Sequence, residues 1–151
     1  MKHALVAYFS ATGVTQRIAN MLALAIDAKA FEIVPREIYT KQDLDWTNDN
    51  SRPSLEMKDK TSRPKIESHV IDMKKYDVVF IGFPIWWYRE PSIIDTFVEM
   101  HDFKDKLIVP FATSGYAPDQ TVDPITCPDG MQQTVSSLLY EGLFRLNEQF
   151  E

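Results

Sequence analysis

A loop rich in hydroxyl groups near the start of the chain joins two segments with different hydrophobic patterns. Residues 4–9 before the loop are continuously apolar, whereas apolar residues after it recur about every 3.6 positions from Val14 to Ile26. The first pattern is typical of a buried strand and the second of a helix. The turn between them exposes the free N–H groups of the first helical turn, which favour an anion. The sequence therefore predicts a strand–turn–helix unit with an anion site at the turn.

The side chains of this loop indicate what kind of anion it suits. Ser10, Thr12 and Thr15 supply hydroxyl donors, and Gly13 allows a ligand to approach the backbone closely. The loop has no Lys, unlike the Gly-Lys-Ser/Thr loop that binds a triphosphate. It suits a phosphate monoester held by neutral donors. Hydroxyl-rich turns are also common as helix caps, so the loop alone leaves that second interpretation open.

Other apolar runs predict further strands. Residues 31–34 alternate apolar and polar up to Pro35, residues 76–83 form the clearest strand, and residues 107–112 form another. Pro110 disfavours a central position for the last of these. Strands that alternate with helices imply a parallel sheet with helices on both faces. Ligands bind such sheets at the carboxyl ends of the strands, where the strand order reverses.

Three loops are expected at that edge of the sheet, and their chemistry is complementary. The first offers phosphate donors, the second contains Trp86, Trp87 and Tyr88, and the third, residues 113–116, offers polar donors and a Tyr. A packed core cannot hide three consecutive large rings, because their side chains must diverge. The loops together predict a site for a phosphate attached to a flat aromatic ring.

The long polar stretch at residues 36–75 is expected to contain one short helix, at residues 54–60. Connections this long are often functional. Trp46 within the stretch is predicted to pack on the core, with a position near the ligand as the alternative.

Composition restricts the class of protein. A chain of 151 residues suggests one domain, residues 1–151, and the net charge of −6 argues against nucleic acid and anionic membranes as partners. A basic protein partner fits this charge better. The single cysteine, Cys127, excludes an internal disulfide, and the three scattered His predict no metal site. Met1 leads almost directly into the first strand, so we expect no signal peptide and a cytoplasmic location.

Three ordered motifs resemble those of the flavodoxins, and more closely the short bacterial flavodoxin-like proteins. They are Ser-Ala-Thr-Gly-Val-Thr at 10–15, Gly-Phe-Pro-Ile-Trp-Trp-Tyr at 82–88 and Pro-Phe-Ala-Thr-Ser-Gly-Tyr at 110–116. The resemblance covers nearly the whole chain. It implies an α/β, doubly wound, five-stranded parallel sheet of order 2-1-3-4-5 between two helical layers, and it implies FMN as cofactor.

The same resemblance implies the residues of the cofactor site. The phosphate contacts would come from Ser10, Thr12, Gly13, Val14 and Thr15. The flavin contacts would come from Pro84, Ile85, Trp86, Trp87, Tyr88, Thr113, Ser114, Gly115 and Tyr116. We predict no catalytic side chain and no metal ligand, because FMN itself would carry the redox chemistry.

The chain departs from the family pattern in three places. Tyr88 and Tyr116 stand where this subgroup often has Gly, and Glu90 is expected to add charge near the flavin edge. Residues 130–139 are expected to be helical, and residues 140–147 are interpreted as the fifth strand, with an extension of that helix as the alternative. The chain ends soon afterwards, which leaves open whether the family's closing helix is present. A homodimer contact or a rearranged C-terminus would then cover that face of the sheet.

Related folds are excluded by their motifs. A receiver domain needs an acceptor Asp after strand three, a small tyrosine phosphatase needs a Cys in the first loop, and a dinucleotide fold needs Gly-x-Gly-x-x-Gly. The sequence has none of these three features. Two classes with FMN remain: a low-potential electron carrier between redox partner proteins, which we favour, and an NAD(P)H:quinone reductase. A binding module that has lost its flavin is a third interpretation.

Overall fold

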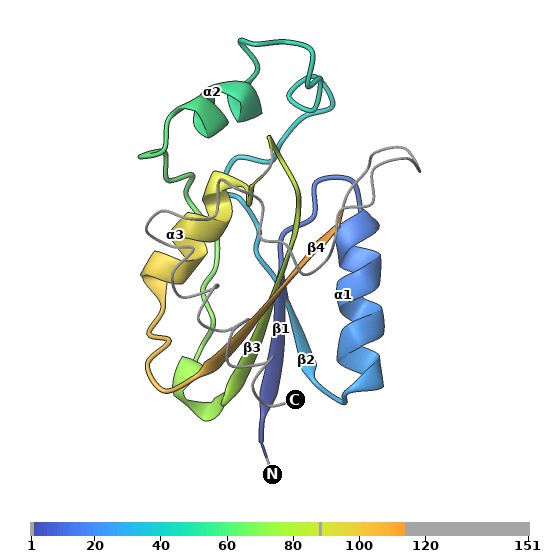
Figure 1. Ribbon diagram of the computed structural model, residues 1–151, viewed down its shortest axis with the longest axis vertical. Coiled ribbons are helices and arrows are strands. Elements are labelled where there is room, and N and C mark those ends of the chain that lie inside the picture. Colours follow the sequence, from blue (N-terminus) through green and yellow to red (C-terminus); the bar gives the residue numbers. More distant parts are fainter. Residues whose placement is uncertain (1, 88, 114–151) are drawn as a thin grey trace.

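The core of the fold is a parallel sheet whose strands are not in chain order. The computed structural model describes residues 2–87 and 89–113. Its sheet has the order β2-β1-β3-β4, built from β1 (Ala4–Tyr8), β2 (Lys29–Glu32), β3 (Val78–Pro84) and β4 (Leu107–Thr113). The pairing is parallel throughout (Figure 1). The predicted order 2-1-3-4 is confirmed, whereas the predicted helix at 130–139 and fifth strand at 140–147 lie outside the described residues.

The two longer helices lie on opposite faces of this sheet. Helix α1 (Val14–Ala25) packs on one face and α3 (Ser92–Met100) on the other (Figure 1). Strand β1 contributes side chains to both faces of the sheet, because side chains of successive strand residues point in opposite directions. Leu5 and Ala7 belong to the apolar cluster that includes α3, and Val6 belongs to the cluster that includes α1. The described residues therefore form the three-layer arrangement that the sequence predicts.

The connection from β2 to β3 passes above the carboxyl ends of the strands (Figure 1). It contains α2 (Arg52–Lys58) and a short 3-10 helix, η1 (Met73–Lys75). Helix α2 begins two residues before the predicted start, because Ser51 caps it and Pro53 is tolerated in a first turn. The Ser51 Oγ accepts a hydrogen bond from the Ser54 N–H at 3.4 Å.

Trp46 does not pack on the core as predicted. Its side chain is 73% exposed, so the core-packing prediction is wrong. Hydrogen bonds between residues close in sequence, such as Thr47 N–H to Asp45 Oδ1 at 3.0 Å, shape the turns around it. Turns held in this way need no apolar anchor.

No helix in the described part of the chain combines the length and apolar character needed to cross a membrane.

Candidate functional site

The loop after β1 has the geometry of an open backbone cradle. Gly13, the residue before α1, has φ of 93°, in the left-handed region that glycine adopts without strain. Its N–H donates to the Ser10 Oγ at 3.0 Å. A side-chain carbon added at Gly13 would meet no other atom within 4 Å. The space beside the Gly13 backbone is therefore open.

The N-terminus of α1 has no side-chain cap among the described residues, in contrast to α2. The N–H groups of its first turn, residues 14–16, have no partner within the helix. No acidic residue occupies this first turn. Within the described residues, the Ser10 hydroxyl accepts from the N–H of Gly13, just before the helix, and no loop hydroxyl accepts from these first-turn N–H groups. The donors that remain suit an anion.

Thr113, the last residue of β4, brings the three predicted loops together. Its Oγ1 lies 2.7 Å from the Oγ1 of Thr15, which is buried at the start of α1. Its carbonyl oxygen accepts a hydrogen bond from the Ile85 N–H at 2.9 Å. One residue therefore fixes the phosphate loop and the aromatic loop relative to the end of β4.

A backbone bridge between Trp86 and Arg89 closes the aromatic loop. The Trp86 N–H donates to the Arg89 carbonyl at 2.9 Å, and the Arg89 N–H donates to the Trp86 carbonyl at 3.1 Å. Trp87, inside the turn, has φ of 46°, which is unusual for a residue other than glycine. Its side chain is 42% exposed. The turn therefore presents Trp87 to solvent at the carboxyl end of β3.

Trp86 has different surroundings. Its ring packs edge-on against Phe9, with centroids 5.5 Å apart, and against Tyr39, at 5.3 Å. The Tyr39 hydroxyl donates to Glu56 Oε2 at 2.6 Å, which ties the ring to α2. Burial, followed by this hydrogen bond, raises the pKa of Tyr39. Sequence reasoning missed Phe9 and Tyr39; Phe9 continues the first apolar run, but nothing marks Tyr39 within its polar stretch.

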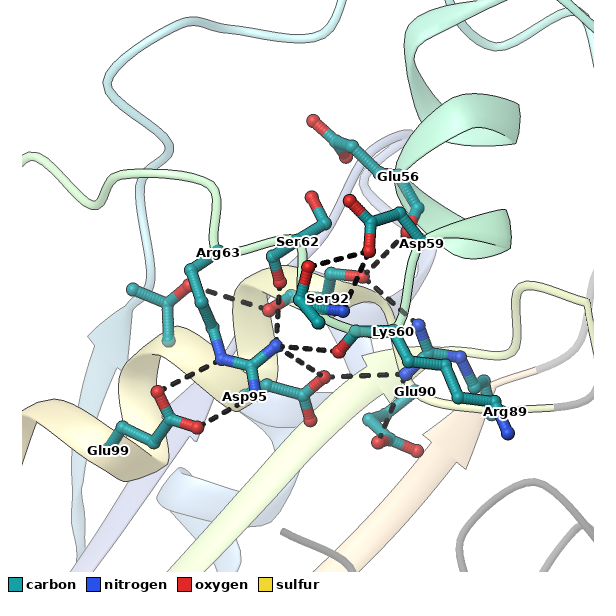
Figure 2. A network of polar contacts seen from close by, with 12 residues as sticks. Glu56, Asp59, Lys60, Ser62, Arg63, Arg89, Glu90, Ser92, Asp95 and Glu99 are labelled. Atoms are coloured by element: carbon teal, nitrogen blue, oxygen red, sulfur yellow. Dashed lines mark hydrogen bonds and ion pairs between the residues drawn. The ribbon is translucent and has the colours of Figure 1, made fainter. Parts of the chain in front are cut away.

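Behind the turn lies a buried group of charged side chains. The Arg89 Nη1 lies 3.3 Å from Asp95 Oδ2 and 3.5 Å from Glu90 Oε1, and Nη2 donates to the Ser92 Oγ at 3.1 Å (Figure 2). Only 3% of Glu90 and 4% of Asp95 are exposed. The expectation that Glu90 adds charge at the flavin edge is therefore wrong. Its side chain turns inward because Arg89 and the start of α3 hold it there.

Burial changes the acidity of both carboxyl groups. Loss of hydration raises the pKa of Glu90 to about 8, and the negative charge of Asp95 adds to this shift. Burial also raises the pKa of Asp95, although the hydrogen bond with Glu90 and the charges of Arg89 and Arg63 oppose the increase. A protonated carboxyl group is therefore favoured in this cluster near neutral pH.

The predicted site residues fall into two groups. The structure brings together the following at the carboxyl edge of the sheet: Ser10, Thr12, Gly13, Val14, Thr15, Pro84, Ile85, Trp86, Trp87 and Thr113. Outside the described residues lie Tyr88, Ser114, Gly115 and Tyr116. Within the first group, Thr12 and Val14 are exposed and Thr15 is buried. Their contacts with a cofactor stay predictions.

A parallel sheet of order 2-1-3-4, with an open glycine loop after β1 and an aromatic turn after β3, defines a flavodoxin-like α/β protein. Comparison with known families agrees with this class. The flavodoxin family model matches residues 3–140, and the chain belongs to that family. No curated protein matches it.

Solved structures show the same fold. A candidate flavoprotein from Bacteroides eggerthii DSM 20697 is 51% identical, with a TM-score of 0.76 over 78% of this chain and 74% of its own. One from Bacteroides uniformis ATCC 8492 is 50% identical, with a TM-score of 0.74 over 77% and 74%. A Lactobacillus acidophilus NCFM flavoprotein, solved in complex with FMN, is 21% identical, with a TM-score of 0.64 over 79% of each chain. The last likeness is one of fold alone.

Proposed function

We propose that this chain binds one FMN at the carboxyl edge of its sheet. The observation that carries the proposal is the uncapped N-terminus of α1 beside the open backbone of Gly13. The hydroxyls of Ser10 and Thr12 add neutral donors, as a terminal phosphate requires. The FMN complex of the Lactobacillus acidophilus flavoprotein, which shares the fold, supports the same cofactor.

The residues of this chain divide the work of binding. Thr12 and the first-turn N–H groups of α1 would hold the phosphate, and Trp87 would cover one face of the flavin ring. Trp86 supports the turn from behind, since its ring already packs against Phe9 and Tyr39. When bound, FMN supplies reversible acceptance of one or two electrons.

The function that we favour is electron transfer between proteins in the cytoplasm. The net charge of −6 favours encounter with partners that have a basic docking surface. The Trp87 ring is exposed, and a ring that covers the flavin would leave less room for a nicotinamide to stack on it. Both features suit a low-potential electron carrier better than an NAD(P)H:quinone reductase. A homodimer is compatible with either activity.

The cofactor proposal is tested by extracting and chromatographing the flavin from purified protein. FMN is expected, and FAD is not, because the first loop offers one phosphate site. Thr12→Val should weaken FMN binding on the order of tenfold or more, the effect of one hydrogen bond to a charged group. Riboflavin, which lacks the phosphate, is the matched control ligand and should bind unchanged. Equal losses for both ligands, or a protein that ignores added FMN, would contradict the proposal.

The choice between carrier and reductase is tested by stepwise reduction monitored by absorbance. A carrier should take up its electrons in two resolved steps and show negligible NAD(P)H–quinone turnover. Direct two-electron bleaching with rapid NAD(P)H oxidation would establish the reductase instead.

A further inference from the structure

The buried carboxyl groups behind the aromatic turn each have an oxygen without a partner. Within the described residues, Glu90 Oε2 and Asp95 Oδ1 are buried and form no hydrogen bond when both groups are ionised. Buried polar atoms are rarely left unsatisfied. A proton on one of the two groups would turn it into a hydrogen-bond donor. The two carboxyl groups meet at the same atom, Arg89 Nη1, which lies 3.5 Å from Glu90 Oε1 and 3.3 Å from Asp95 Oδ2.

Cations in the cluster are too few to balance both charges. Arg89 faces both carboxyl groups, at 3.5 Å from Glu90 and 3.3 Å from Asp95. Arg63 approaches Asp95 Oδ2 only to 3.9 Å, and its fork is already bidentate with Glu99, at 2.9 and 2.8 Å.

The neighbouring elements bring no further cation to the pair. From α2, Arg52 is paired with the Glu56 side chain, and Glu56 meets the cluster through its carbonyl oxygen, which accepts from Ser92. The Asp59 carboxylate accepts a hydrogen bond from the Thr61 hydroxyl. The Lys60 carbonyl oxygen accepts one from Arg63 (Figure 2). Arg89 is therefore the one cation in contact with both buried carboxyl groups among the described residues.

We propose that Glu90 and Asp95 share one proton at neutral pH and that this proton holds the Trp86–Arg89 turn in place. The shared proton leaves one negative charge for Arg89, so the guanidinium stays bound to Ser92 and Asp95 at the start of α3. The Arg89 backbone in turn closes the bridge to Trp86 and fixes the position of Trp87.

Loss of the proton would place two negative charges on one buried cation. Hydration of Glu90 would relieve the repulsion, and it requires the segment at 89–90 to move away from α3. The turn should therefore loosen as pH rises through the pKa of Glu90, near 8. For FMN this consequence rests on the proposed function, because Trp87 is then displaced from the flavin.

The proton itself is tested by infrared difference spectroscopy on the full-length protein without FMN. A protonated carboxyl band, shifted in D₂O, is expected at pH 6.5 and should lose half of its intensity near pH 8. Glu90→Gln, whose amide can still donate to Asp95, should remove the band and keep the fold. Asp95→Asn provides a second variant. Glu67→Gln is the matched control, because it removes the carboxyl group of a side chain that is 62% exposed. A wild-type protein with no protonated carboxyl group at pH 6.5 would overturn the proposal.

The effect on the turn is tested by Trp emission in a Trp46→Phe background, which leaves Trp86 and Trp87 as reporters. The emission should change with the same midpoint as the infrared band, and Glu90→Gln should make it independent of pH. A band that titrates while the emission stays constant would refute the link to the turn. Both measurements need no cofactor, so they stand apart from FMN binding. If FMN binds, its Kd should rise above the midpoint by at most about tenfold per pH unit, the limit for one linked proton.

Discussion

The hydroxyl oxygens of Thr15 and Thr113 lie 2.7 Å apart, although 98 positions separate the two residues in the chain. Thr15 is 1% exposed, so its hydroxyl has little access to water. This contact joins the first turn of α1 to the end of β4. The contact adds a direct side-chain link between the phosphate loop and the third loop, whose strands are otherwise connected through β3.

Thr113→Val should destabilise the fold by about 1–3 kcal/mol, because it leaves the buried Thr15 hydroxyl without its partner. Thr113→Ser keeps a hydroxyl and is the control. The double variant Thr15→Val/Thr113→Val should lose less stability than the sum of the single variants, since both polar groups are then gone. Urea denaturation measures each value. Strict additivity would show that the two hydroxyls do not interact.

Trp86→Ala should mainly lower the stability of the fold, whereas Trp87→Ala should mainly change the emission of bound flavin. Trp86→Ala removes two edge-on aromatic contacts and should cost about 1–3 kcal/mol of stability. Trp87→Ala removes an exposed ring and should change stability by only about 0.5 kcal/mol. Bound flavin should be almost non-fluorescent in the wild type and should recover its emission in Trp87→Ala. Flavin emission and affinity unchanged in both variants would exclude stacking by either ring.

Gly82→Ala should destabilise the sheet by about 1–3 kcal/mol through overpacking, because the new carbon would lie 2.2 Å from the Phe111 ring. Phe111→Leu in the same chain should recover part of the loss. Gly13→Ala is the matched comparison: it meets no atom within 4 Å, and its cost of about 1 kcal/mol arises from a φ of 93°. Phe111→Leu should not rescue Gly13→Ala. Rescue of both variants, or of neither, would contradict this distinction.

Half-buried His101 and buried Glu90 should compensate each other in their effects on stability between pH 4.5 and 6.5. Burial lowers the pKa of His101, whose Nε2 accepts from the Val70 N–H, so the unfolded chain takes up a proton below pH 6.5 and stability falls. Glu90 has the opposite sign, because the folded chain keeps its proton while unfolded Glu loses one above pH 4.5. Each effect has a slope of at most about 1.4 kcal/mol per pH unit.

The wild type should therefore show little dependence of stability on pH in this window. His101→Asn should become more stable as pH falls, and Glu90→Gln should become less stable. His3→Gln, at an exposed position, is the control and should follow the wild type. Denaturation midpoints at several pH values measure these slopes, and parallel curves for the two test variants would refute the assignment.

The sheet and the convergence of its loops at one edge could be predicted from the sequence, but the buried side of α1 could not. Continuous apolar runs identify parallel strands, and loops that follow such strands converge at one edge. The 3.6-residue period of large apolar residues correctly predicted a helix and would place those residues on its buried side. The side of α1 that is buried instead consists of Thr15, Ala19 and Ala23. Small residues allow the helix to approach the sheet closely, and the larger Ile18 and Met21 are exposed. Residue size at the contact, which periodicity ignores, determined the orientation.

The aromatic turn shows a second limit of sequence reasoning. Consecutive aromatic residues predicted that some ring would be exposed, but not which one. The choice depends on Tyr39, a residue from a distant polar stretch that packs on Trp86. The inward turn of Glu90 likewise depends on Arg89 reaching Asp95 on α3. Contacts of this kind leave no pattern in the sequence, because they depend on how separate elements are placed in space.

The strand order also determines when this site can form as the chain folds. β1 lies between β2 and β3, and its pairing with β3 joins Ala4 to Val78. Pairings so distant in sequence close slowly, because the long intervening loop must lose entropy before any contact compensates for it. On the ribosome, the N-terminus of α1 can form early, but Thr15 gains its partner Thr113 only after synthesis has reached a residue 98 positions further along the chain. Cofactor capture should therefore be a late event in biosynthesis, after the sheet has closed.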